Sequence, residues 1–337
     1  MKQQLFLGLV VLLLLILLPL TSLWGKPAQP QQPGDGKILV GTNTLPAGTA
    51  NTARANPRLQ ADAQAAVPVM RSGTGKVEAV PMEEYLMGCL AAEMPAEYHI
   101  EALKAQVVAS HTYVRYKLEV AGAQRLSDSG ASDQAYLSKQ ERQNRFGVMF
   151  EGYEEKFAAA VQAVQNETVT FDDVPIFAAF HSQNGGMTES AETYWGDTLE
   201  YLQSTNSPGD KLAPNYSESV TFTPKEIKKA LADEEVVLRG DETQWFGKPK
   251  RSNAGTVRTI AVGGQTIAGP KLRTLLGLRS ANFTIAYKGG KFVFTCLGHG
   301  HGVGMSQYGA DFMARQGSDY REILRHYYAG CDVSRDR

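Results

Sequence analysis

The stretch EEYLMGCLAAEMPAEYHIEALKAQVVASHTYVRY, from Glu83 to Tyr116, predicts two consecutive helices with a break between them. The first covers residues 82–92 and ends at Met94-Pro95, because the residue before a proline avoids the helical region of backbone conformation. The second covers about residues 99–120, and its apolar residues recur at helical spacing. Its predicted buried side consists of Leu103, Val107, Val114 and Leu118.

A single carboxylate, Glu93, lies at the end of the first predicted helix, after a run of small apolar residues. The helix dipole disfavours a negative charge there, which raises the pKa of a carboxyl group. Apolar surroundings raise that pKa further. A proton-donating acid needs such an upward shift, so Glu93 is the candidate catalytic acid. The alternative is an exposed helix end with no chemical role.

A polar stripe is predicted on the second helix. Lys104, His111 and Arg115 lie seven and four residues apart and so share one face. The stripe is either an ordinary solvated surface or a set of groups that contact substrate and tune the acid. We assign Lys104 and His111 to the second role as candidate binding residues.

Strands and helices alternate along the rest of the chain without a strand–helix–strand rhythm, which favours an α+β fold with short antiparallel hairpins. Hairpins are predicted where turn residues separate short apolar runs, from residue 67 to about 80, at 168–186 with Asp172-Asp173 at the turn, at 255–269 and at 282–296. Further helices are predicted at 155–167, 223–234, 270–278, 305–317 and 319–330.

The ends and composition of the chain bear on its location. Residues 5–24 carry no charge and are long enough to cross a bilayer, so residues 1–24 are predicted to be a membrane anchor, with a cleaved signal peptide as the alternative. Residues 25–66 are rich in Pro, Gln and Ala and are predicted to be a flexible tether. Residues 67–337 form the predicted globular domain, placed outside the cytoplasm.

The net charge of −1 gives no reason to expect nucleic acid as a partner. The three cysteines are too few and too far apart to form a disulfide framework. Cys89 is predicted to be a small core residue. A bridge between Cys296 and Cys331 is left open.

Two glycine-rich segments combine polar and aromatic residues. The first, FHSQNGGMTESAETYWG, begins at Phe180, and the second, CLGHGHGVGMSQYGA, begins at Cys296. Glycine lets backbone amides approach a ligand closely, so both segments are candidate linings of a site for a sugar polymer, although each could be only a set of tight turns. The candidate binding residues are His181, Ser182, Gln183, Gly185, Gly186, His301, Ser306 and Gln307.

Other chemistries fit these residues less well. Cys296, His299 and His301 could supply three zinc ligands, but no acidic fourth ligand is close in sequence. A serine hydrolase would need a nucleophile elbow, which HSQNGG does not provide. A cysteine nucleophile is disfavoured because Cys89 lies within a predicted helix and Cys296 within a predicted strand.

Three motif-bearing segments resemble the stage II sporulation protein D family. They are EEYLMGCLAAEMPAEYHIEALKAQVVASHTYV, AFHSQNGGMTESAETYWG and GHGHGVGMSQYGADFMARQGSDYREILRHYY, and the resemblance runs in matching order from about residue 67 to residue 331. The resemblance implies a single catalytic domain behind an N-terminal transmembrane helix. It also implies a lytic transglycosylase that cleaves the bond between N-acetylmuramic acid and N-acetylglucosamine in peptide-stripped glycan strands.

The resemblance carries further expectations about site and setting. It places the catalytic acid at Glu93 of the EMP motif and a functional lysine at Lys104 of EALKAQ. The implied partners are the amidase stage II sporulation protein P and stage II sporulation protein M. The implied location is the mother-cell membrane, facing the forespore septum during engulfment.

Two departures from the family pattern affect the expected site. His111 stands where relatives usually have an arginine, and Ser127 and Asp133 stand where some relatives have zinc-binding cysteines. We therefore expect no metal at that position and no cofactor. Two alternatives to a one-acid mechanism stay open. One is a wall-binding module that recruits an amidase and does not cut. The other is a hydrolase that uses a second carboxylate, drawn from Glu97, Glu101, Glu189 and Glu192.

Overall fold

The computed structural model describes residues 66–335, which all lie in one compact unit of the chain, Leu39–Arg337. The predicted membrane anchor at residues 1–24 and nearly all of the predicted tether at residues 25–66 fall outside the described residues. Among residues 66–335, no helix is both long and apolar enough to cross a membrane.

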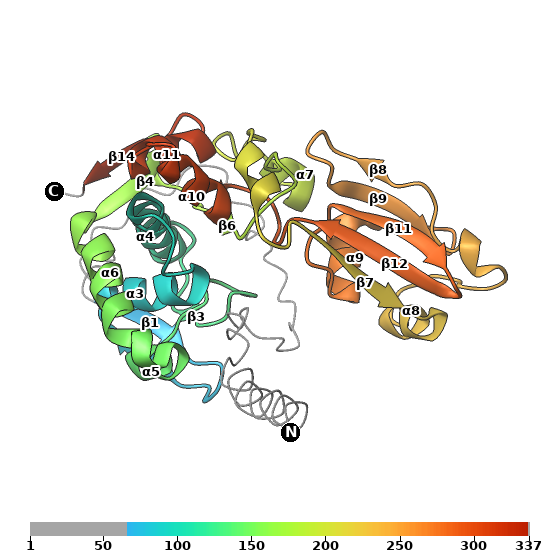
Figure 1. The fold of residues 1–337 in the computed structure, drawn as a ribbon, viewed down its shortest axis with the longest axis horizontal. Coiled ribbons are helices and arrows are strands. Elements are labelled where there is room, and N and C mark those ends of the chain that lie inside the picture. The colour runs from blue at the N-terminus through green and yellow to red at the C-terminus, as the bar shows by residue number, and fades with distance from the viewer. Residues whose placement is uncertain (1–65, 336–337) are drawn as a thin grey trace, which may run out of the picture. The chain divides into compact units, whose positions relative to one another are not determined.

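Helices and short strands alternate along these residues and make a mixed α+β fold, as the sequence predicts (Figure 1). The α-helices are α3 (Met82–Glu93), α4 (Ile100–Arg115), α5 (Lys139–Phe146), α6 (Phe150–Ala163), α7 (Ala191–Trp195), α8 (Pro224–Ala230), α9 (Gly269–Leu276), α10 (Gln307–Arg315) and α11 (Tyr320–Tyr327). A π-helical turn, η1 (Tyr116–Val120), extends α4, and short 3₁₀ turns are η2 (Gly147–Met149), η3 (Pro208–Leu212) and η4 (Glu242–Gln244).

The strands are short and pair mostly in threes. They are β1 (Val67–Met70), β2 (Val77–Val80), β3 (Leu126–Ser127), β4 (Glu167–Phe171), β5 (Val174–Pro175), β6 (Phe180–His181), β7 (Ser217–Phe222), β8 (Lys250–Arg251), β9 (Val257–Val262), β10 (Gln265–Ala268), β11 (Phe283–Lys288), β12 (Lys291–Leu297), β13 (Met305–Ser306) and β14 (Asp332–Arg335). Within residues 66–335 the sheet orders are β2-β1-β3, β10-β9-β8, β11-β12-β7, β14-β4-β5 and β13-β6.

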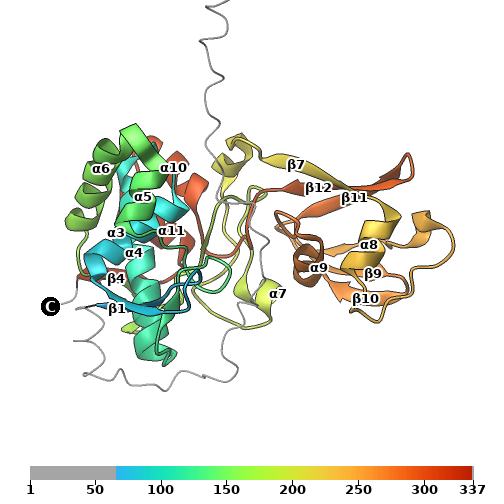
Figure 2. The same cartoon turned by 90° about the horizontal axis from the view of Figure 1, so that it is seen from below.

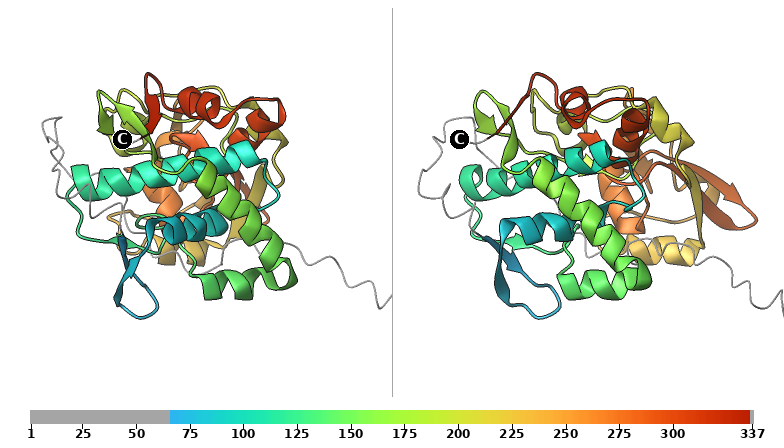
Figure 3. Two further views of the ribbon diagram at one scale, coloured as in Figure 1. Left: turned by 90° about the vertical axis from the view of Figure 1, so that its left-hand side faces the viewer. Right: turned by 60° about the vertical axis from the view of Figure 1, so that its left-hand side comes forward.

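Helix α4 is the centre of the larger hydrophobic core. It packs against α3, α6, α10 and α11 and against strand β4, and its crossing with α6 is visible in Figure 3. Every residue from Ala102 to Arg115 is buried except Lys104. Small residues such as Ala105 and Ala109 let the neighbouring helices approach closely. A helix that is covered on all sides carries buried residues all round rather than on one stripe.

A second hydrophobic core lies in residues 222–296, among strands β7–β12 and helices α8 and α9 (Figure 2). The hairpin β11–β12 pairs Tyr287 with Phe292 and extends to β7 through pairs such as Phe292 with Phe222. Its fully buried aromatic residues include Phe283 and Phe294. Helix α8 begins with a capping box, in which Thr223 and Glu226 satisfy each other's backbone N–H groups.

Most predicted elements are confirmed. The helix pair ends and begins on either side of Met94-Pro95, and all four predicted hairpin turns join antiparallel strands. At the turn β4–β5, Asp172 and Asp173 have φ values of 50° and 62°, the left-handed region that a tight hairpin requires. The hairpin predicted at residues 168–186 is wrong in its extent, because after the β4–β5 turn only Val174–Pro175 and Phe180–His181 are strands. Helix α5 was not predicted, although its capping box at Ser138 and Glu141 was a usable signal.

Pairing between distant segments brings the glycine-rich regions together. Strands β6 and β13 are parallel, with Phe180 opposite Met305 and His181 opposite Ser306. A second contact, an antiparallel bridge, joins Gln183 to His299. The three cysteines are free and buried, which confirms Cys89 as a core residue; Cys296 and Cys331 form no bridge.

Two glycines give a paired test of this packing. A Cβ added at Gly88 in α3 would overlap the Tyr136 ring and the Leu137 carbonyl, whereas one added at the exposed Gly152 in α6 would meet nothing within 4 Å. We expect Gly88→Ala to lower the free energy of unfolding by about 1–3 kcal/mol through overpacking. Gly152→Ala should raise it by about 0.5–1 kcal/mol, because alanine favours the helix. Urea denaturation measures both, and equal effects would contradict the packing described.

Candidate active site

Glu93 is the last residue of α3, and the chain turns away directly after it. Met94 is extended, with φ −122° and ψ 142°, and its N–H still donates to the Leu90 carbonyl. Residues 89–92 are buried, while Glu93 itself is half-buried. Helix α3 thus ends with a partly exposed carboxyl group that directly follows buried apolar residues.

Two N–H donors fix this carboxyl group. The backbone N–H of Ala135 donates to Glu93 Oε1 at 2.8 Å. The side chain of Gln307, the first residue of α10, is the second polar group at this carboxyl group and lowers its pKa by hydrogen bonding. Gln307 Nε2 also donates to Oε1 of the buried Gln106 at 3.3 Å. Glu93 therefore lies where α3, α4, α10 and the loop before α5 meet.

The loop that carries Ala135 is held by Asp133. One carboxylate oxygen, Oδ2, accepts from the Ser127 backbone N–H at 2.8 Å. The other, Oδ1, accepts from the Tyr113 hydroxyl at 2.9 Å and lies 2.9 Å from the Lys117 ammonium. These contacts tie the loop to the end of α4 through hydrogen bonds and an ion pair. No group of three or more metal-binding side chains occurs among residues 66–335.

The surroundings of Glu93 raise the pKa of its carboxyl group above its ordinary value. Burial is the largest cause and favours the neutral acid. The hydrogen bonds from Ala135 and Gln307 and the positive charge of Arg145 oppose it by stabilising the carboxylate. The net upward direction is that expected for a group that gives up a proton near neutral pH.

The histidines of the glycine-rich segments are held neutral. Burial lowers the pKa of His181 and of His299 to about 4, and it lowers the pKa of His301 well below its ordinary value. His181 Nδ1 lies 3.1 Å from the Val303 carbonyl, and Nε2 lies 3.2 Å from Asn184 Nδ2, which defines an Nδ1–H tautomer. The ring of His301 lies 5.7 Å from that of His181 and 5.2 Å from that of Trp195.

The other predicted binding residues of these segments are largely engaged with their own chain. Gln183 Nε2 donates to the Asn215 carbonyl at 3.2 Å, and the Ser182 carbonyl accepts from the Tyr308 N–H at 3.0 Å. A Cβ at Gly185 would overlap Asn282, and one at Gly186, where φ is 104°, would overlap Lys211. At Gly186 the positive φ favours glycine, whereas at Gly185 a side chain would have to displace the Asn282 amide.

A buried carboxyl group that the sequence did not single out, Asp210, links the two glycine-rich segments. It lies in η3 and accepts from Ser306 Oγ at 2.6 Å and from the Asn184 backbone N–H at 3.0 Å. Burial outweighs these bonds and raises the pKa of Asp210 to about 6. At pH 7 it is therefore mostly ionised. Ser306, predicted as a binding residue, is fully buried and caps α10 by accepting from the Gly309 N–H.

The structure does not bring Lys104 and His111 to Glu93. Lys104 Nζ pairs with Glu101 Oε1 at 2.7 Å and lies over the Tyr320 ring. His111 is buried, and its Nδ1 lies 2.9 Å from the Glu167 carbonyl. It also lines a cavity of about 210 Å³ with Met82 and Leu86, at the opposite end of α3 from Glu93. The predicted polar stripe thus packs against neighbouring elements, and the roles assigned to these two residues stay predictions.

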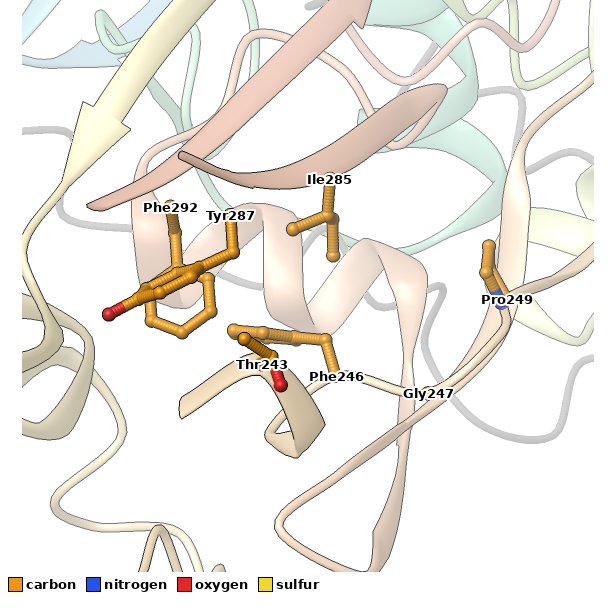
Figure 4. Close-up of a pocket in the computed structure, with 7 residues that line it drawn as sticks. All are labelled: Thr243, Phe246, Gly247, Pro249, Ile285, Tyr287 and Phe292. Carbon is orange, nitrogen blue, oxygen red and sulfur yellow. The ribbon is translucent and has the colours of Figure 1, made fainter. Parts of the chain in front are cut away.

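A cavity of about 130 Å³ lies in the second core, lined by Thr243, Phe246, Gly247, Pro249, Ile285, Tyr287 and Phe292 (Figure 4). Its walls come from η4, the segment before β8 and the hairpin β11–β12, and none of the predicted site residues lines it. We do not assign it to the site around Glu93.

Sequence reasoning missed four residues of the site: Ala135, Gln106, Arg145 and Asp210. Ala135 acts through its backbone, which no side-chain pattern reveals. Gln106 lies in the EALKAQ motif, but its contact with Gln307 joins residues 201 positions apart and has no local sequence signal. Arg145 and Asp210 carry no local signal, because tertiary structure alone brings them to the site.

The structure is that of a mixed α+β protein in which the carboxyl group of Glu93, with a raised pKa, lies beside the loop at Ala135 and the second glycine-rich segment at Gln307. Residues 70–171, which include Glu93 and Ala135, match the family model described as "Stage II sporulation protein". The chain is 38% identical to stage II sporulation protein D of Bacillus amyloliquefaciens over 296 residues, covering 85% of this chain and 84% of the relative. It is 37% identical to stage II sporulation protein D of Bacillus subtilis over 304 residues, covering 88% and 85%.

The chain therefore belongs to the stage II sporulation protein D family, as its motifs predict. A more distant relative is a protein of Bacillus subtilis named "Amidase enhancer", 25% identical over 305 residues, which cover 74% of this chain and 40% of that protein.

Arg145 allows a test of the charge balance at Glu93. Because its positive charge lowers the pKa of Glu93, we expect Arg145→Gln to raise that pKa. Selective ¹³C labelling of glutamate carboxyl groups in the full-length chain reports the titration by NMR, with the signal assigned from Glu93→Gln. Arg239→Gln, which changes an exposed arginine near the second core, is the matched control. If the pKa of Glu93 were unchanged or lower in Arg145→Gln, the charge effect assigned to Arg145 would be contradicted.

Proposed function

We propose that the protein is a lytic transglycosylase that cleaves the bond between N-acetylmuramic acid and N-acetylglucosamine in peptide-stripped glycan strands, with Glu93 as general acid and then general base. The observation that carries this proposal is the half-buried carboxyl group of Glu93, whose pKa burial raises while Ala135 and Gln307 hold it in place. Family membership supports a sporulation role in cell-wall degradation.

The reaction needs one acid. Protonated Glu93 gives its proton to the bridging oxygen, and the bond from that oxygen to C1 of the muramic acid breaks with its electron pair leaving on oxygen. An oxocarbenium-like centre forms at C1. The 6-hydroxyl oxygen of the same sugar then bonds to C1, and the Glu93 carboxylate takes the hydroxyl proton. The products are a 1,6-anhydro sugar and a new 4-hydroxyl group, with Glu93 again protonated.

The surroundings of the other acids favour this mechanism over hydrolysis by two carboxylates. Glu97 accepts from the Tyr153 hydroxyl at 2.6 Å. Glu101 pairs with Lys104, and Glu189 is buried and accepts from the Ser190 N–H and from Ser252 Oγ. These three candidates for a second carboxylate are thus committed to contacts of their own. The fourth, Glu192, is exposed on α7.

The alternative of a non-cutting wall-binding module rests on the substitution of the family's usual arginine by His111. Because His111 packs against β4 at the far end of α3, the substitution leaves the contacts of Glu93 intact. This supports an active enzyme.

The cellular setting is also a proposal. We propose that residues 1–24 anchor the chain in the mother-cell membrane and that the domain faces the septum from outside the cytoplasm. There it would act after an amidase has removed the stem peptides, with stage II sporulation proteins P and M as partners. The similarity to a protein named for enhancing an amidase supports a link to amidases.

The decisive variant is Glu93→Gln. Glutamine keeps an oxygen for the Ala135 N–H but has no acidic proton, so we expect cleavage of peptide-stripped strands to fall by about 10²–10⁴-fold with the fold unchanged by circular dichroism. Glu97→Gln, which removes an exposed acid nearby in sequence, is the matched control and should cut normally.

Mass spectrometry of the digest separates the candidates. Anhydro ends indicate a lytic transglycosylase, reducing ends indicate a hydrolase, and uncut strands indicate a binding module. Wild-type activity in Glu93→Gln would show that another group is the acid.

A further inference from the structure

The carboxylate of Asp210 is a meeting point for hydrogen-bond donors. Its Oδ1 accepts from Ser306 Oγ at 2.6 Å and from the Asn184 N–H at 3.0 Å. Its Oδ2 accepts from Asn184 Nδ2 at 3.2 Å and from Ser207 Oγ. The group is fully buried and so has no surface on which to contact a substrate. Its effect must pass through the residues that it holds.

One of these links leads to Glu93. Ser306 is the N-cap of α10, and the next residue, Gln307, makes the side-chain hydrogen bond to Glu93. A bond of 2.6 Å from Ser306 to Asp210 therefore fixes the start of the helix that supplies this donor. The Tyr308 N–H, bonded to the Ser182 carbonyl at 3.0 Å, fixes the same turn against the first glycine-rich segment.

A second link leads to His181. Asn184 bonds Asp210 through both its backbone and its side chain, and the same Nδ2 lies 3.2 Å from His181 Nε2. Asn184 Oδ1 also accepts from the Gly186 N–H at 2.7 Å. The side chain thus organises the turn between His181 and Gly186. Both glycine-rich segments are therefore anchored on the same carboxylate.

The first turn of α10 packs closely against the residues around Asp210. A Cβ added at Gly309 would lie 2.9 Å from Asp210 Oδ2 and would also overlap Ser207 Oγ and the Tyr327 hydroxyl. The Tyr327 hydroxyl lies 2.7 Å from Ser207 Oγ and continues the chain of hydrogen bonds into α11. The first turn of α10 is therefore in direct contact with this cluster.

We propose that Asp210 is a positioning residue for the reaction at Glu93, because it holds the start of α10 so that Gln307 reaches the acid and holds the turn that carries His181. This inference rests on the proposed function. It requires a carboxylate, since four donors converge on two oxygen atoms. In an amide, one of these oxygens becomes an NH₂ group that faces Asn184 Nδ2, donor against donor.

The test uses Asp210→Asn in the full-length chain. We expect kcat for cleavage of peptide-stripped strands to fall by about 10- to 100-fold, as for a displacement of catalytic groups, with KM nearly unchanged. Because the Gln307 bond lowers the pKa of Glu93, its loss should raise that pKa, measured by ¹³C NMR. Asp319→Asn, which changes the exposed N-cap of α11, is the matched control and should alter neither value.

A paired exchange provides a rescue. In the double variant Asn184→Asp/Asp210→Asn, the new amide donates to the new carboxylate, and the amide oxygen introduced at position 210 can still accept from Ser306. We expect the pKa of Glu93 to return and kcat to recover in part. The new carboxylate would lie beside His181 Nε2, so the pKa of His181 should rise in this variant only.

Should Asp210→Asn not fold, Ser306→Ala removes the hydrogen bond from Ser306 to Asp210 together with the N-cap of α10, leaves Asn184 bonded to Asp210, and must give the same rise in the pKa of Glu93. The inference is overturned if these variants lower the free energy of unfolding but leave the pKa of Glu93 and kcat at wild-type values. It is also overturned if the double variant Asn184→Asp/Asp210→Asn restores neither the pKa of Glu93 nor kcat. A wild-type chain that forms no anhydro ends would instead refute the proposed function, while the titration of Glu93 would still show whether Asp210 controls its environment.

Discussion

A carboxyl group that is to donate a proton must be poorly solvated and yet precisely held, and these two requirements conflict. Hydrogen bonds that fix the group stabilise its charged form and lower its pKa, whereas burial raises the pKa. At Glu93 burial exceeds the combined effect of the Ala135 N–H, the Gln307 amide and the charge of Arg145. Both donors are uncharged, so they can fix the position of the carboxyl group with a smaller lowering of its pKa than an ion pair would impose.

The two donors reach Glu93 from separate parts of the chain, and each is supported by an acid of its own. Asp133 ties the Ala135 loop to α4 through Ser127, Tyr113 and Lys117. Asp210 ties the start of α10 to the first glycine-rich segment. The α4 side of the site is completed by Gln106, which joins Gln307 to the centre of the core. Rigid support of this kind is what keeps a catalytic group in a productive geometry.

Local sequence signals predicted the parts of the fold that local physics determines. The break at Met94-Pro95, the hairpin turn at Asp172-Asp173 and the start of the helix predicted at residues 223–234 follow from local preferences and appear in the structure. The position of Glu93 at the end of α3 was predictable for the same reason. The capping box that begins α5 is an equally local signal.

Contacts between residues far apart in the chain could not be predicted from the sequence. Polar residues at helical spacing predict a solvent-exposed helix face. Helix α4 is instead covered by neighbouring elements, and His111 and Arg115 pack against β4. Asp210 stands in a 3₁₀ turn without a motif, and only the parallel pairing of β6 with β13 explains why a carboxylate belongs there. The position of Arg145 beside Glu93 likewise depends on how α5 packs against α3.

The contact between Gln106 and Gln307 spans 201 residues of chain. During synthesis, Glu93 is therefore made long before Gln307. A nascent chain that has folded only its first helices contains Glu93 but lacks the contacts that α10 provides. The contacts around Glu93 are therefore complete only after the segment that contains Gln307 has been synthesised and folded. A truncated or arrested product would lack the Gln307 donor and, with it, the finished site.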